Sequence, residues 1–187
     1  MTEVKLVTDK DIWDLLGIGS TILVPLITLG FGVLVLRLTK RMEQTQWKSQ
    51  KIIEKRIEEW DGIREELNDI FCYCVRVGDW KSLTPETVIE RKRVADKNMH
   101  LARPYFSPTF FHAYVRFIKV CFAQYQGHGV DAKIKSPVWE HQDSYTGSWH
   151  PDWDILCHER VSTEEELWDA YNELIYNVAV ELETNVK

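Results

Sequence analysis

The stretch from Leu15 to Leu36 constrains this chain most, because it contains no charged side chain. As an α-helix with a rise of 1.5 Å per residue it would be about 33 Å long, and the hydrocarbon core of a bilayer is about 30 Å thick. A secretory signal has a basic start, a shorter apolar run and a small-residue cleavage site, and this stretch follows none of these rules. We therefore expect a retained transmembrane helix.

The charges on either side of this stretch set its expected orientation. Residues 1–14 are acidic on balance, whereas residues 37–51 carry an excess of Lys and Arg, which membrane proteins keep on the cytoplasmic side. The four cysteines form no CxxC pair, and reduced thiols agree with a cytoplasmic location. The predicted segments are an extracytoplasmic N-terminus at 1–14, a transmembrane helix at 15–36 and a cytoplasmic helical domain at 37–187.

Small residues and one proline share one side of the predicted span. They recur at spacings of three or four, and they are Gly17, Thr21, Pro25, Thr28 and Gly32. Such a stripe lets helix backbones approach closely, which favours association of helices within a membrane. One helix cannot enclose water, so a conducting role requires an oligomer. The alternative is a simple anchor, because Gly and Pro are common in membrane helices in general.

Hydrophobic periodicity continues beyond the span. Between Leu38 and about Val77 there is no proline, and apolar residues recur every three or four positions from Ile53 to Cys74, which is the pattern of one helix face. Gly78 is the expected stop. We therefore expect one continuous helix that runs on from the membrane span.

Two further helices begin with recognisable signals. Thr84 and Ser107 each precede a proline, so each is expected to be an N-cap residue followed by proline at the first helical position. The helix after Thr84 is expected to end at Pro104, and the helix after Ser107 is expected to end at Gly127.

The last helix is expected to start at Ser162, which can form a capping box with Glu165. Apolar residues then follow one helical face as far as Leu182, and no strand pattern competes with the helical one. The predicted architecture is all-α, with an N-terminal transmembrane helix that continues into a cytoplasmic bundle of four helices.

A long connection between Gly127 and Ser162 interrupts this bundle. Connections of this length without regular structure are usually functional or disordered, and its aromatic content argues against disorder. The segment is therefore expected to pack on the bundle or on a neighbouring subunit, with Trp139, Trp149 and Trp153 as candidate contact residues.

The same loop is rich in side chains that can bind metal ions. They are His141, Asp143, His150, Asp152, Asp154, Cys157 and His158. Their spacing matches no established pattern of zinc ligands. Polar loop composition explains them more simply, and we expect neither a metal nor another cofactor.

Arg93 and His100 form one candidate catalytic pair. Seven positions make nearly two helical turns, so both side chains would share a helix face about 10 Å apart. Two such pairs facing each other across a dimer could bind a phosphate through Arg and transfer a proton through His. The pair is common by chance, and a solvated or core-edge role is the simpler explanation.

The layout as a whole resembles a known family. A small protein with one N-terminal span, a helical domain and the segments "VGDWKSLTPETVIERKRVADKNMHLARPYFSPTFF" and "CFAQYQGHGVDAKIKS" is similar to the membrane accessory protein of type VI-B CRISPR systems. In the wider HEPN superfamily of ribonucleases a polar residue often follows the arginine of the motif. Here the residue is Val94, which disfavours nuclease chemistry more than it disfavours a HEPN-like four-helix fold.

The resemblance implies a function in anti-phage defence beside an RNA-guided RNase. It implies a ring-shaped homo-oligomer in the bacterial inner membrane, whose spans surround a pore that depolarises the membrane on activation. No small-molecule substrate is expected. Two alternatives stay open, namely a non-conducting membrane scaffold or adaptor and a membrane-tethered HEPN-like ribonuclease.

Overall fold

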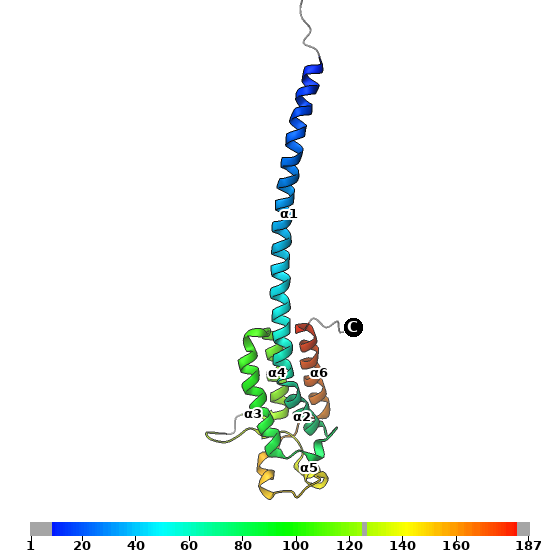
Figure 1. The fold of residues 1–187 in the computed structure, drawn as a ribbon. Helices are drawn as coiled ribbons and strands as arrows, with labels where there is room; N and C mark the ends of the chain where they lie inside the picture. Colours follow the sequence, from blue (N-terminus) through cyan, green and yellow to red (C-terminus); the bar gives the residue numbers. More distant parts are fainter. Residues whose placement is uncertain (1–8, 125–126, 183–187) are drawn as a thin grey trace, which may run out of the picture. The chain divides into compact units, whose positions relative to one another are not determined.

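The chain divides into two compact units, Met1–Gln50 and Lys51–Lys187. The computed structural model describes the backbone of residues 9–124 and 127–182, and the side chains of residues 24–124 and 127–182. Helices dominate the described residues, as Figure 1 shows. The prediction of an all-α fold class is therefore confirmed.

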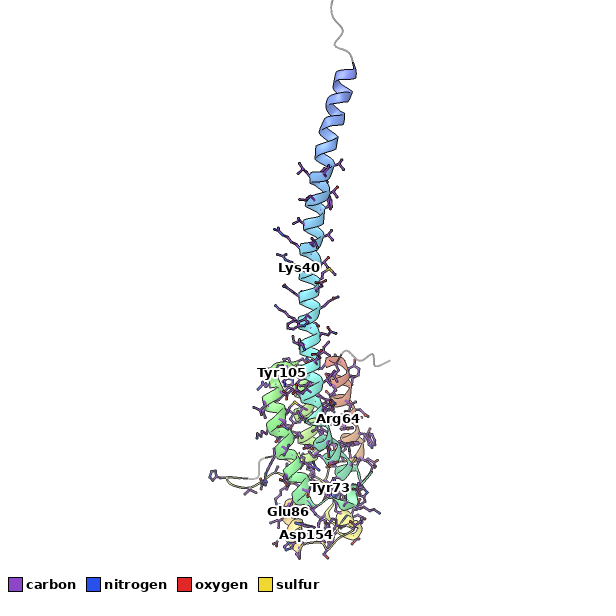
Figure 2. The ribbon with its side chains drawn as sticks, viewed as in Figure 1. Lys40, Arg64, Tyr73, Glu86, Tyr105 and Asp154 are labelled. Atoms are coloured by element: carbon purple, nitrogen blue, oxygen red, sulfur yellow. The ribbon has the colours of Figure 1, made fainter. Side chains whose placement is uncertain are left out.

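The first helix, α1, spans Asp9–Asp61 without interruption and includes Pro25. In the first unit its described side chains are exposed and extend away from the helix, Lys40 among them (Figure 2). Over the side chains described from residue 24 onward, no helix combines the length and hydropathy that crossing a membrane requires. The side chains of residues 15–23, the first part of the predicted span, lie outside the described residues. The transmembrane helix at 15–36 therefore stays a prediction.

The prediction of a continuous helix from 38 to about 77 is wrong, because the helix is interrupted at Gly62. There α1 ends and a second helix, α2, spans Arg64–Val75. The amide of Ile63 donates to the carbonyl of Trp60 at 3.0 Å, and the Gly62 carbonyl accepts the side chain of Asn98 at 3.3 Å. The Asn98 side chain thus occupies the Gly62 carbonyl, which would otherwise accept a hydrogen bond within the helix. Glycine also has a low helix propensity.

Four helices build the core of the second unit, where they lie side by side in Figure 1. Besides α2 they are α3 at Pro85–Ala102, α4 at Pro108–Cys121 and α6 at Glu164–Glu181. The most extensive packing joins α4 with α6 and α2 with α3. These helices lie where four helices are predicted, with α2 in place of the longer first helix.

The expected inner faces of these helices are buried or partly buried. On α3 the predicted stripe from Val88 to Ala102 is buried throughout, Lys92 included. On α4 the core also takes up Phe110 and Phe117. Burial of large apolar side chains is the main favourable contribution to folding, so these faces fix how the helices pack.

The predicted caps of α3 and α4 are confirmed, and that of α6 lies one residue further on. Ser107 accepts a hydrogen bond from the Phe110 amide at 3.2 Å. For α6 the capping box is formed by Thr163 and Glu166 rather than by Ser162 and Glu165. The Ser162 hydroxyl instead donates to the Val120 carbonyl at 2.7 Å, a contact with a distant segment that sequence spacing cannot reveal.

Helix α4 ends at Cys121 rather than at Gly127. The next two residues form strand β1, Phe122–Ala123, which pairs antiparallel with β2, Lys133–Ile134. The expectation that no strand forms is therefore wrong for this short ribbon. The pairing places both Phe122 and Ile134 in the core, which explains why the chain leaves the helix there.

The long connection is ordered and packs on its own unit. It contains helix α5 at Val138–Ser144 and a 3₁₀ turn, η3, at Pro151–Leu156. Two further 3₁₀ turns lie elsewhere, η1 at Trp80–Ser82 and η2 at Arg103–Tyr105. The stack of His141 on Tyr73 of α2 confirms that this segment packs on the bundle, and a contact with a neighbouring subunit stays a prediction.

Candidate functional site

The predicted helix-packing stripe lies on α1. Gly17 and Thr21 fall outside the residues whose side chains the structure describes. Thr28 donates its hydroxyl to the Val24 carbonyl at 2.8 Å, so this hydroxyl is satisfied within its own helix. A Cβ built on Gly32 meets no atom within 4 Å. The described part of the stripe is therefore open to another helix.

The sequence-predicted pair Arg93 and His100 lies on α3, and both side chains are exposed. The Arg93 guanidinium forms a 2.5 Å ion pair with Asp131, which raises the pKa of Arg93 through the hydrogen bond. The His100 ring contacts Phe111 edge-on, with centroids 5.4 Å apart. Different neighbours thus engage the two side chains, and they do not form one site within a single chain.

The basic residues next to Arg93 also have acidic partners. Arg91 pairs with Glu66 at 3.0 Å and with Asp69 at 3.3 Å. The buried Lys92 pairs with Asp96 at 2.5 Å. Acidic partners therefore neutralise the charges of these three basic residues.

The three candidate contact tryptophans lie in different environments. Trp139 on α5 is 65% exposed. Trp149 and Trp153 pack edge-on against each other with centroids 5.1 Å apart, and Tyr145 packs against both. Trp149 and Trp153 therefore stabilise the loop from within. The exposed ring of Trp139 is available for contact with another subunit.

The residues considered as metal ligands are dispersed by the fold. Cys157 is buried beside β2, whereas His158 accepts the Arg160 amide at 2.9 Å at the surface. Within the described ranges, no three His, Cys, Asp or Glu side chains lie close enough together to hold a metal ion.

His141 is the most deeply buried of these residues. Its ring stacks on Tyr73, with centroids 3.9 Å apart and planes at 3°, and its Nε2 lies 2.7 Å from the Ser136 hydroxyl. Burial, followed by the charge of Arg76, lowers the pKa of His141 to about 4. The imidazole is therefore neutral near pH 7, and it acts as part of the core.

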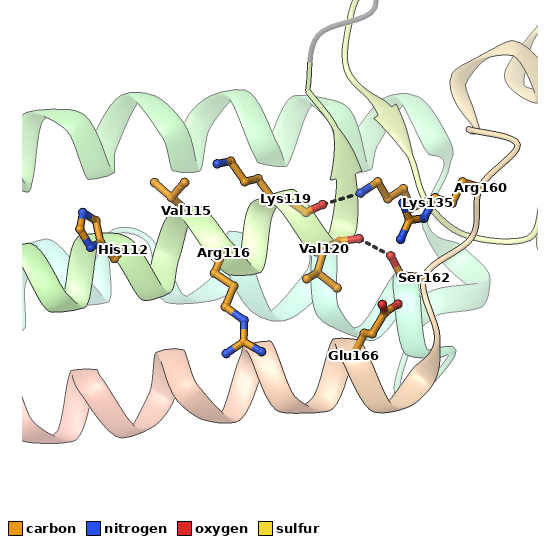
Figure 3. A pocket seen from close by; sticks show the side chains of 9 residues that line it. All are labelled: His112, Val115, Arg116, Lys119, Val120, Lys135, Arg160, Ser162 and Glu166. Carbon is orange, nitrogen blue, oxygen red and sulfur yellow. Dashed lines mark hydrogen bonds between the residues drawn. The ribbon is translucent and has the colours of Figure 1, made fainter.

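A basic pocket, which the sequence did not indicate, opens between α4 and the loop before α6 (Figure 3). Its volume is about 450 Å³. Its lining residues are His112, Val115, Arg116, Lys119, Val120, Lys135, Arg160, Ser162 and Glu166. We call this the α4–α6 pocket.

Three segments position the charges of the α4–α6 pocket. His112, Arg116 and Lys119 are spaced by four and three residues on α4, so they share one helix face. Lys135 follows β2 and donates to the Lys119 carbonyl at 2.7 Å. Arg160 belongs to the loop before α6. The helical spacing on α4 was visible in the sequence, but nothing there showed that two other segments bring cations to the same place.

Comparison with known proteins adds no relative. No protein-family model matches the chain, and neither the curated proteins nor the solved structures searched provide a match.

Proposed function

We propose that this protein is a membrane accessory protein of anti-phage defence. Several copies assemble into a ring, their N-terminal helices line a pore, and opening of the pore depolarises the bacterial inner membrane beside an RNA-guided RNase. The resemblance to accessory proteins of type VI-B CRISPR systems supports the defence context. The pore itself rests on the physical properties of the N-terminal helix.

The observation that carries this proposal is the exposed apolar surface of α1. From Val24 to Leu36 the large apolar side chains are between 43% and 69% exposed. A continuous apolar surface is unfavourable in water. Large exposed apolar patches mark sites of protein association or membrane contact. Together with the uncharged sequence from Leu15 onward, this surface supports insertion into a bilayer.

The small-residue stripe supports self-association of the inserted helices. In lipid there is no hydrophobic drive between helices, so close backbone packing at small residues supplies much of the attraction. The open surface at Gly32 is available to a neighbouring copy. In a ring of such helices, one face of each helix would line a central pore.

Two glycines allow a matched test. Gly30 and Gly32 both accept a Cβ with no atom within 4 Å, so a larger side chain at either one fits within a single chain. At 100° per residue the two lie about 200° apart around the helix, and only Gly32 belongs to the stripe. Gly32→Leu is expected to abolish depolarisation and to reduce oligomer size, whereas Gly30→Leu is expected to preserve both.

The measurements are a voltage-sensitive dye in cells under phage challenge and the particle mass in mild detergent. Both variants must stay in the membrane fraction, which separates loss of assembly from loss of insertion. Equal depolarisation by Gly32→Leu and the wild type would count against the pore. If the wild-type particle has the mass of a single 22.0 kDa chain, the pore hypothesis is refuted.

The adaptor alternative differs in one respect that can be tested. An adaptor needs only a tether, so residues 37–187 on an unrelated transmembrane helix would retain full defence. We expect this chimera to lose defence, because the pore is formed by the native span.

A further inference from the structure

We propose that the α4–α6 pocket binds a small phosphorylated molecule of about the size of a nucleotide. The site lies wholly within the second unit, so the proposal stands or falls independently of the pore.

Positive charge is concentrated in the lining of the α4–α6 pocket. Arg116, Lys119, Lys135 and Arg160 line the pocket together with a single carboxylate, that of Glu166, although the whole chain has a net charge of −6. A concave surface lined mainly by one sign of charge focuses the electrostatic potential, so this lining favours an anionic occupant.

The carboxylates near the pocket already have hydrogen-bond or ion-pair partners. Glu166 accepts the Thr163 amide at 2.9 Å in the capping box, and this hydrogen bond lowers the pKa of Glu166. Glu173 pairs with Arg116 at the surface. An incoming anion would therefore meet Lys119, Lys135 and Arg160 without displacing the helix cap.

The charge types and the size of the pocket indicate the chemical class. An Arg guanidinium donates hydrogen bonds in a planar fork that matches phosphate oxygens, and Lys adds a compact charge. The volume of about 450 Å³ lies within the range of small-molecule sites, about 300–1,000 Å³. One or two phosphate groups with an attached organic moiety fit these properties.

A nucleic-acid strand fits less well. Proteins that hold single strands combine a basic groove with aromatic side chains on which bases stack. Among the described residues that line the pocket, His112 is the only one with a ring. A compact phosphate compound therefore matches the lining better than a polymer does.

The test is calorimetric titration of the full chain in mild detergent with sodium pyrophosphate. Lys119→Gln combined with Arg160→Gln removes two cations of the pocket, and it is expected to weaken binding at least tenfold. The matched control, Arg64→Gln with Lys97→Gln, removes the same two charge types from exposed positions on α2 and α3 and is expected to leave binding unchanged.

Two outcomes would overturn the proposal. One is the absence of binding by the wild type at millimolar pyrophosphate, and the other is equal affinity of the pocket variant and the wild type. Helix content by circular dichroism checks folding. If the double variant is unfolded, Lys119→Gln alone is expected to weaken binding at least threefold, and unchanged affinity would again refute the site.

Two further probes identify the source of the phosphate. ATP represents a nucleotide, and dihexanoyl phosphatidic acid represents a lipid headgroup in soluble form. Tighter binding of ATP assigns the pocket to a nucleotide, whereas tighter binding of the lipid analogue assigns it to a headgroup. In both cases the affinity must fall in the pocket variant, and an unchanged affinity of both probes there counts against the site.

Discussion

Arg56 connects three segments of the second unit through its guanidinium. It donates to the Tyr105 carbonyl at 2.6 Å and to the Glu181 carbonyl at 2.8 Å, and it pairs with the Glu181 carboxylate at 3.1 Å. The buried Glu181 also accepts the Ser107 amide at 2.9 Å. One ion pair therefore joins the end of α1 to the start of α4 and the end of α6.

Glu181→Gln is expected to destabilise the fold by about 3 kcal/mol, because removal of one partner leaves the other charge poorly compensated in a buried setting. The free energy of unfolding from urea titration measures the loss. Glu54→Gln is the control, since Glu54 forms an exposed pair with Lys51 and such pairs contribute less than about 1 kcal/mol. Equal losses in the two variants would contradict the assigned role of Glu181.

His141 is expected to make stability depend on pH. Its pKa is about 4 in the folded protein and about 6.5 in an unfolded chain, so the unfolded state binds the proton more readily. Its contribution is fully present above about pH 6.5 and falls progressively as the pH drops toward 4. The expected loss is about 3 kcal/mol, from a shift of roughly 2.5 pKa units at 1.36 kcal/mol each.

His141→Gln tests this assignment, because Gln keeps a polar group near Ser136 and does not titrate. The variant is expected to be less stable at pH 7, since it loses the stack on Tyr73, and to show a flatter dependence between pH 6.5 and 4. Unfolding midpoints in urea across this range measure the slope. An unchanged slope would show that other groups govern the acid sensitivity.

At the scale of elements, the helices begin where short polar side chains cap them. Thr84, Ser107 and Thr163 each accept a hydrogen bond from an amide three residues ahead. The first four amides of a helix have no partner within it, so these caps define where each helix starts.

Ser107→Ala is expected to destabilise the protein by about 1 kcal/mol, because it removes the acceptor for the Phe110 amide. Ser107→Gly is the matched comparison, with an expected loss of only about 0.3 kcal/mol, since water can then reach the amide. Thermal unfolding of both variants gives the difference. A larger loss for Gly than for Ala would contradict capping as the cause.

At the scale of the whole molecule, the charge pairs of α3 bear on the nuclease alternative. Arg93 is engaged by Asp131, and the His100 ring contacts Phe111. These features favour a structural role for Arg93 and His100 over phosphate chemistry.

Under the proposed function, Arg93→Ala combined with His100→Ala is therefore expected to retain full defence, measured as plaque formation by phage in cells that carry the complete system. The change in stability is expected to stay below about 1 kcal/mol for the exposed Arg93 pair. Loss of protection with unchanged protein abundance would revive the ribonuclease alternative.

The sequence by itself determined the helical class and most of the helix positions. Caps and prolines at Thr84 and Ser107, together with the apolar stripe on α3, depend on contacts within a few residues, and such contacts are encoded locally. The uncharged stretch at 15–36 likewise predicts a transmembrane helix from the sequence alone, because membrane insertion depends on local hydropathy.

Only the tertiary structure decided the features that depend on distant partners. Asn98 meets the carbonyl of Gly62, where the first helix breaks, and Ser162 turns to Val120, so the last cap moves to Thr163. The α4–α6 pocket exists because folding brings Lys135 and Arg160 to the cationic face of α4. Contacts between segments far apart in the chain leave no spacing signal in the sequence, and only the packed fold creates them.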